Sequence, residues 1–216
     1  MKLLLLRLEG PMQSWGENAK WDAIRDTATM PTKSGIIGLL ACCLGLSRDD
    51  PDIMNLSRSL NISVRADRAG EIRFDYHTVQ GMPVINTADG GKRKKGSGIV
   101  TSRAYLEDAS FFVVITGDTE TLEKCAEALN NPVWPPYLGR KSCVPVLPIL
   151  LQITDSFISV EDAIRNYPLT SRHDDIVSAQ LDDTSGIYTR TDEPVSFKER
   201  RFIKRNVNYL SMNVGE

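Results

Sequence analysis

The sequence predicts an α+β fold in which an antiparallel sheet is backed by two helical segments. Hydrophobic residues make up 41% of the 216 residues and charged residues 25%, which is ordinary composition for a folded protein. Residues 2–8 form an almost unbroken apolar run, as expected of a strand that is buried on both faces. Strand and helix patterns follow in the order β-α-β-β-α-β, which is the ferredoxin-like or RRM-like pattern.

Capping signals and periodicity predict the individual elements. Thr32 or Ser34 can cap a helix over residues 35–44, and Gly45 follows its last turn. Asp50 and Pro51 are typical of the start of a second short helix, ending near residue 60. Residues 119–130 have the pattern of an amphipathic helix. Strand patterns occupy residues 61–66, 72–77, 103–108, 110–115 and 149–154.

The remaining segments are loops and a β-rich tail. Residues 10–30 form a long connection without a stable period, and such connections are usually functional. Glycines and prolines between residues 79 and 102 predict a projecting loop or hairpin. Beyond residue 159, a short helix near residues 161–166 precedes strand patterns at 187–191 and 201–210. We therefore predict a first domain over residues 1–155, including a projecting segment at residues 79–103, and a smaller β-rich C-terminal subdomain over residues 156–216.

Composition also bears on the compartment and on cofactors. The apolar run at the start is too short for a signal-peptide core, and no stretch approaches the roughly 18 apolar residues of a membrane span. The four cysteines include no CxxC pair, so neither a disulfide framework nor a zinc site is indicated. We expect a cytoplasmic protein with no metal and no cofactor.

Charge is segregated along the chain although the net charge is only −2. Basic residues gather at positions 92–95, 140–141 and 198–205, whereas acidic residues gather at 49–52, 174–175 and 182–183. A single charged run is by default a solvated surface. Three separate basic clusters favour one positive face for a nucleic acid, with other faces left for protein partners.

Lys33 and Ser34, at the start of the first helix, invite comparison with a phosphate-binding P-loop. The glycines of that motif are missing, and Pro31 lacks the N–H that a phosphate nest needs, so nucleotide hydrolysis is not expected. Two uses remain open for this segment: it can hold one RNA phosphate, or it can serve as a plain helix cap.

Aromatic and basic residues on loops are further candidates. Trp15 can stack an unpaired base, although burial in the core is the alternative. Tyr137, Arg140 and Lys141 lie around a glycine that permits close backbone approach, a combination suited to phosphate and base contacts. His77 follows a strand and fits a structural role better than that of a catalytic base, and no acid/base pair is evident.

Several sequence blocks, taken in order, resemble the CasD subunits of type I-E Cascade. The similarity covers most of residues 1–150 and is looser beyond them. The blocks are Gly10-Pro11-Met12-Gln13-Ser14-Trp15-Gly16, Arg25 with Thr27, Pro31-Thr32-Lys33-Ser34-Gly35, Asp75-Tyr76-His77-Thr78-Val79, Tyr105-Leu106-Glu107-Asp108-Ala109-Ser110-Phe111 and Pro136-Tyr137-Leu138-Gly139-Arg140-Lys141-Ser142-Cys143.

The resemblance implies a RAMP protein with an RRM-like domain that binds the 5′ handle of the CRISPR RNA and has no catalytic role. It implies that the chain caps the backbone subunits of the complex, contacts the large subunit, and meets target DNA only through the complex. The segment at residues 79–102 would be a thumb hairpin near the first guide nucleotides. The predicted RNA contacts are Trp15, Arg25, Lys33, Ser34, His77, Lys92, Arg93, Lys94, Lys95, Arg103, Tyr137, Arg140 and Lys141.

Two alternatives stay open. In a sister subtype the equivalent subunit is a metal-independent endoribonuclease that processes the CRISPR precursor RNA, and Tyr76, His77 and Lys33 would be the residues to suspect here. A generic RRM-like module for messenger RNA is disfavoured because no aromatic-rich RNP-type strand motif is present.

Overall fold

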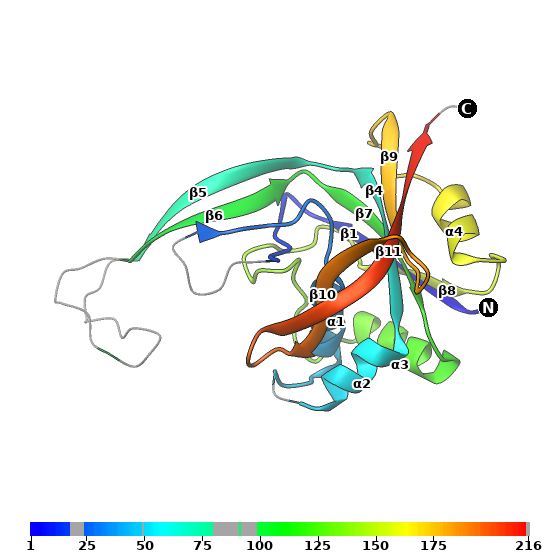
Figure 1. Cartoon of the computed structure of the whole chain (residues 1–216), viewed down its shortest axis with the longest axis horizontal. Coiled ribbons are helices and arrows are strands. Elements are labelled where there is room, and N and C mark those ends of the chain that lie inside the picture. Colours follow the sequence, from blue (N-terminus) through cyan, green and yellow to red (C-terminus); the bar gives the residue numbers. More distant parts are fainter. Residues whose placement is uncertain (18–23, 49, 80–90, 92–98, 215–216) are drawn as a thin grey trace.

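Two β-sheets form the framework of the protein (Figure 1). The structure, a computed structural model, describes residues 1–17, 24–48, 50–79, 91 and 99–214. The helices are α1 (Lys33–Leu44), α2 (Asp52–Ser59), α3 (Thr119–Asn130) and α4 (Val160–Asn166). The strands are β1 (Leu3–Glu9), β2 (Met12–Gln13), β3 (Ile24–Arg25), β4 (Asn61–Arg68), β5 (Glu71–Val79), β6 (Ile99–Glu107), β7 (Ser110–Thr116), β8 (Leu150–Thr154), β9 (Ile176–Asp182), β10 (Tyr188–Ser196) and β11 (Arg201–Asn213).

The larger sheet has seven strands in the order β10-β11-β9-β4-β7-β1-β8. Its part β4-β7-β1-β8 is antiparallel, with α1 and α2 between β1 and β4 in sequence and α3 between β7 and β8. This confirms the predicted α+β class. The strands and helices of this part of the sheet follow the predicted β-α-β-β-α-β order, whereas β2, β3, β5 and β6 belong to the other sheet. Within the described residues, no helix is long and apolar enough to cross a membrane.

Strand β1 lies inside this sheet and is buried on both faces, as predicted. Leu4, Leu6 and Leu8 belong to the core beneath α1 and α3, because side chains alternate between the faces of a strand. Leu3 and Leu5 point to the other face, into a second core that includes residues of α4. Two covered faces explain why the apolar run is continuous rather than alternating.

Helix α1 has the caps that the sequence predicts. The Thr32 hydroxyl accepts a hydrogen bond from the Gly35 N–H at 3.1 Å, and Gly45 ends the helix with a φ of +76°. Helix α2 begins at Asp52, one residue later than predicted, with the Asp50 carboxylate accepting from the Asp52 N–H at 2.9 Å. Helix α3 spans the predicted residues.

The C-terminal region is β-rich, as predicted, and its strands continue the main sheet. Strand β9, which the sequence patterns miss, pairs with β4 through Val64 and Gln180, and β11 and β10 follow. Strands from both sides of residue 155 therefore share one sheet. The boundary between residues 1–155 and 156–216 as separate domains stays a prediction.

The smaller sheet carries a hairpin that projects from the body of the molecule (Figure 1). Strands β5 and β6 pair over their whole length, from Glu71 opposite Glu107 to Val79 opposite Ile99. Residues 99–102, predicted as part of a projecting loop or hairpin, therefore belong to a strand of the hairpin. The predicted thumb cations Lys92, Arg93, Lys94 and Lys95 lie outside the described residues.

Candidate nucleic-acid interface

A cleft of about 710 Å³ opens beside β6, where five segments that are distant in sequence meet. Six arginines and two carboxylates line it, so the lining carries four more positive than negative charges. The charged and aromatic lining residues are Arg25, Arg48, Arg103, Arg140, Arg200, Arg201, Glu17, Asp26, Phe197 and Phe202. We call this region the arginine cleft.

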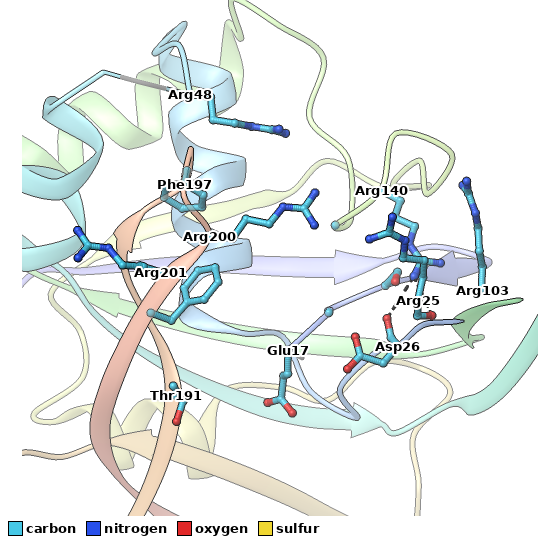
Figure 2. A pocket seen from close by; sticks show the side chains of 14 residues that line it. Glu17, Arg25, Asp26, Arg48, Arg103, Arg140, Thr191, Phe197, Arg200 and Arg201 are labelled. Carbon is cyan, nitrogen blue, oxygen red and sulfur yellow. Dashed lines mark hydrogen bonds between the residues drawn. The ribbon is translucent and has the colours of Figure 1, made fainter. Parts of the chain in front are cut away.

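The arginines approach the cleft from opposite sides. Figure 2 shows Arg48 and Arg200 on one side and Arg25, Arg103 and Arg140 on the other. Arg48 follows α1 and Arg200 lies in the turn between β10 and β11, whereas Arg25 belongs to β3 and Arg103 to β6. Guanidinium groups converging on one cavity form a site that favours an anionic ligand, above all one with several phosphates.

Arg200 is an exposed residue whose guanidinium lies near other positive charges. Partial desolvation lowers the pKa of this guanidinium, and the neighbouring charges of Arg25 and Arg48 lower it further. Arg200 also has a φ of 51°, a left-handed backbone conformation that is uncommon for a residue other than glycine. Arg201 points away from the other arginines (Figure 2). A bound anion would offset the repulsion among the three like charges.

Arg140 builds the wall of the cleft through its own hydrogen bonds. Its guanidinium donates to the carbonyl oxygens of Asp26 at 3.1 Å and Arg25 at 3.2 Å (Figure 2). It donates as well to the Ala104 carbonyl oxygen at 3.0 Å. It also lies 4.7 Å from the centroid of the Tyr105 ring, a cation–π geometry. Arg140 therefore ties β3 to β6 and contributes its charge from a fixed position.

The glycine beside Arg140 is required by contacts within the chain. Gly139 has a φ of +86°, and a Cβ there would lie 1.7 Å from the carbonyl oxygen of Ser14. The Ser14 N–H donates to the neighbouring Leu138 carbonyl at 3.0 Å. The close approach that the sequence predicts is thus between two loops of the protein.

The hypothesis that Trp15 stacks a base is wrong for this structure. The side chain is 1% exposed, and its indole N–H donates to Gln13 Oε1 at 3.0 Å. The ring packs against α1 so closely that a Cβ at Gly35 would approach it to 2.7 Å. The alternative of core burial is therefore correct, because a ring enclosed on all sides offers no face to a ligand.

Lys33 is not a phosphate ligand here, because it belongs to a buried network. Its ammonium lies 2.6 Å from Glu193 and 3.9 Å from Asp182, and its backbone N–H donates to Asp192 at 2.9 Å. Arg205 pairs with Asp192 at 2.7 Å. Burial alone would raise the pKa of Asp192, but its hydrogen bond and charge interaction with Arg205 lower the pKa on balance.

Ser34 is also buried, and its hydroxyl donates to the Thr32 hydroxyl at 3.2 Å. The plain-cap alternative for this segment is therefore correct. The network fastens the start of α1 to β9 and β10, and Arg205 of β11 joins it through Asp192.

The other predicted residues are dispersed. Arg25, Arg103 and Arg140 line the arginine cleft, Lys141 is exposed nearby in sequence, and Tyr137 is half-buried in a neighbouring cavity. Among the described residues, no partner is found for the buried Nδ1 of His77. No three or more His, Cys, Asp and Glu side chains in the described part of the chain are placed to hold a metal ion.

Sequence reasoning missed Arg48, Phe197 and the convergence of Arg200 on the cleft. Arg200 and Arg201 lie in the basic cluster at residues 198–205, which the charge pattern assigns to a positive face without singling out either residue. Arg48 is isolated from other cations in sequence, so only the fold reveals it.

The fold and the cleft define an α+β protein that carries a projecting hairpin and a cavity suited to a phosphate-rich ligand. The profile of the CRISPR-associated protein family Cas5 matches residues 3–208, and the chain belongs to this family. The CRISPR system Cascade subunit CasD of Escherichia coli (strain K12) is 35% identical over 215 residues, with 94% of this chain and 92% of that protein covered.

Solved structures of CRISPR-associated proteins are also similar to this chain. A chain of a CRISPR RNA-guided surveillance complex is 35% identical, with a TM-score of 0.81 and coverage of 98% of this chain and 90% of that one. A second structure, described as that of a Cas protein, is 33% identical, with a TM-score of 0.72 and coverage of 98% and 95%. The fold is therefore similar over nearly the whole chain.

Proposed function

We propose that this protein is a non-catalytic subunit of a type I-E CRISPR surveillance complex and binds the 5′ handle of the CRISPR RNA. The observation that carries the proposal is the arginine cleft, whose guanidinium groups suit a bent single strand with several phosphates. Membership of the Cas5 family and the similarity to CasD support this assignment. Such a complex operates in the cytoplasm, in antiviral defence.

The projecting hairpin supports the proposal that other subunits cover this chain. Ile72, Phe74 and Tyr76 are 42%, 67% and 73% exposed, and their spacing places all three on one face of β5. Neighbouring exposed apolar side chains of this kind are typical of interaction sites. We propose that the backbone and large subunits of the complex are the partners, and that target DNA is met only through them.

The arrangement of the suspected nuclease residues supports a non-catalytic role. Tyr76 and His77 are adjacent on β5, so their side chains point to opposite faces of the strand. Lys33 is 5% exposed and held by Glu193. These residues do not form a shared acid/base site, whereas RNA cleavage without metal requires proton transfers at one phosphate.

Salt-dependent binding tests the role of the cleft. Replacing Arg48 and Arg200 with Ala should weaken binding of a repeat-derived handle RNA and reduce the salt slope by roughly 1.4, since each phosphate contact to a single strand contributes about 0.7. The matched control replaces Arg165 and Arg172, two exposed arginines outside the cleft lining, and should leave affinity and slope unchanged. Equal effects of the two variants would contradict the proposal.

Incubation with the cognate repeat RNA and a chelator tests the enzyme alternative. We expect intact RNA. Site-specific cutting that His77→Ala abolishes would establish the endoribonuclease instead.

A further inference from the structure

A second cavity of about 320 Å³ adjoins the arginine cleft, and its lining is mainly aromatic and aliphatic. The two cavities share Arg48, Gly139 and Phe197 as lining residues. We call the second cavity the aromatic groove. Its lining residues are Ser34, Gly35, Gly38, Leu39, Ala41, Cys42, Leu46, Arg48, Ile53, Trp134, Tyr137, Gly139 and Phe197.

Three aromatic rings from two distant segments surround the groove. Trp134 is 44% exposed, and Tyr137 and Phe197 are half-buried. Helix α1 faces the Phe197 ring with Gly38, where a Cβ would reach ordinary contact distance, 3.8 Å, whereas Trp15 fills the space beside Gly35. The missing side chain at Gly38 thus leaves the groove open between the helix and Phe197, near the cations of the arginine cleft.

The loop that carries Trp134 is held in position before any ligand arrives. The Val133 N–H donates to the Cys43 carbonyl at 2.9 Å. The Cys42 thiol lies 3.7 Å and 3.6 Å from the carbonyl oxygens of Trp134 and Pro135, within reach of weak S–H hydrogen bonds. A site whose walls are already fixed loses little entropy on binding.

We propose that the aromatic groove receives one unstacked base of the RNA whose phosphates lie in the arginine cleft. This inference rests on the proposed function and deepens it. A nucleobase is flat, binds to aromatic and guanidinium faces by stacking, and is attached through its sugar to a phosphate, so it fits an aromatic cavity that opens beside a phosphate site.

Two features favour a base over a protein side chain as the occupant. Arg48 stands at the junction of the cavities, where it can contact a phosphate in one and stack on a base in the other. The continuous lining through Gly139 and Phe197 also joins the groove to the positive cleft rather than to a separate surface.

The groove holds its base by stacking rather than by reading its edge. The Ser34 hydroxyl already donates to Thr32, and the Cys42 thiol faces two carbonyl groups. Base–aromatic stacking tolerates every base because each has a π-face. Removal of the base should therefore matter more at this position than exchange of one base for another.

A double-mutant cycle between protein and RNA tests the inference. Each handle position in turn is replaced by an abasic nucleotide, and affinity is measured for the wild type, Trp134→Ala, Phe197→Ala and the control Tyr188→Ala. Tyr188 is a 52% exposed aromatic residue outside the groove. Trp134→Ala and Phe197→Ala should each weaken binding of intact handle RNA about 5- to 150-fold. Trp134→Phe should restore most of the affinity.

The expected signature is specific to one position. With an abasic nucleotide there, the wild type and Trp134→Ala should bind equally, while base exchange should change affinity less than about threefold. Losses that are the same at every abasic position would overturn the inference. So would a Trp134→Ala variant that binds RNA normally but fails to assemble with other subunits, because the groove would then receive protein.

The two proposals fail separately. If Arg48→Ala with Arg200→Ala weakens RNA binding but the groove variants do not, the groove inference is wrong and the handle-binding function stands. If neither set of variants affects RNA binding, the proposed function itself is wrong.

Discussion

Replacing Lys33 with Met should destabilise the protein while leaving RNA affinity unchanged. Lys33, Arg190 and Arg205 face the carboxylates of Asp182, Asp192 and Glu193 in the buried network. Met keeps the volume of the side chain but leaves one buried negative charge without compensation. Breaking such a pair costs about 3–5 kcal/mol.

The lower end of that range applies because the carboxylates keep other donors. Glu193 still accepts from the Ser57 hydroxyl at 2.7 Å, and Asp182 from the Ile62 N–H at 3.0 Å. A loss of about 3 kcal/mol corresponds to a fall in melting temperature of roughly 6–12 °C for a domain of this size.

The control has the same ion-pair distance at the surface. Lys2 lies 2.6 Å from Glu123, but the two side chains are 34% and 57% exposed, so Lys2→Met should cost no more than about 1 kcal/mol. Urea denaturation measures the free energy of unfolding of both variants, and RNA titration measures their affinity. Equal stability of the two variants, or a Lys33→Met variant that is stable but has lost RNA affinity, would refute a structural role for Lys33.

Three further predictions follow from single sites. The pKa of Asp192 is lowered in the folded state, so its ionised form stabilises the fold above the ordinary Asp pKa of about 3.9. This contribution disappears as the pH falls through the lower, folded-state pKa. Urea denaturation between pH 3 and 6 should therefore show that Asp192→Asn is less stable than the wild type near pH 6 and that this difference shrinks at acid pH. Burial raises the pKa of the Cys42 thiol, an effect that Lys141 partly opposes, so the rate of Cys42 alkylation should still increase above pH 9.0. Mass spectrometry should show that handle RNA protects Cys42 from alkylation. Buried Cys43, whose pKa is raised to about 12, should be labelled more slowly than Cys42. Gly139→Ala should lower both the melting temperature and RNA affinity, because its Cβ would collide with the Ser14 carbonyl, and normal values of both would show that the loops can separate freely.

The elements that sequence patterns predict well are those whose signals are local. Helix α1 depends on Thr32 and Gly45 at its own ends, and β1 on a run of leucines. Strand β9 was missed because Gln180 points into the protein, fully buried, where it accepts a hydrogen bond from Arg190. Polar residues at buried positions erase the alternation on which strand prediction depends.

The site was harder to predict because its contacts are distant in sequence. A lysine at the start of a helix suggested a phosphate site, but the partners of Lys33 are carboxylates of the protein itself. Its backbone N–H binds Asp192, 159 residues later, and local sequence patterns do not detect such a distant partner. Arg25 and Arg140 were found because they lie in recognisable blocks, and Arg103 because it ends the predicted projecting segment at residues 79–103. Their meeting with Arg48 and Arg200 is a property of the fold, since five separate segments form the cleft.

Photo-crosslinking in the assembled complex tests the central claim most directly. A CRISPR RNA with 4-thiouridine placed in the 5′ handle is irradiated, and the crosslinked peptides of this chain are sequenced, with 4-thiouridine in the distal guide as the control. We predict handle crosslinks to peptides that carry Arg48, Arg140 or Phe197 to Arg201, and none from the distal guide. Handle crosslinks confined to peptides outside the arginine cleft and the aromatic groove would contradict it.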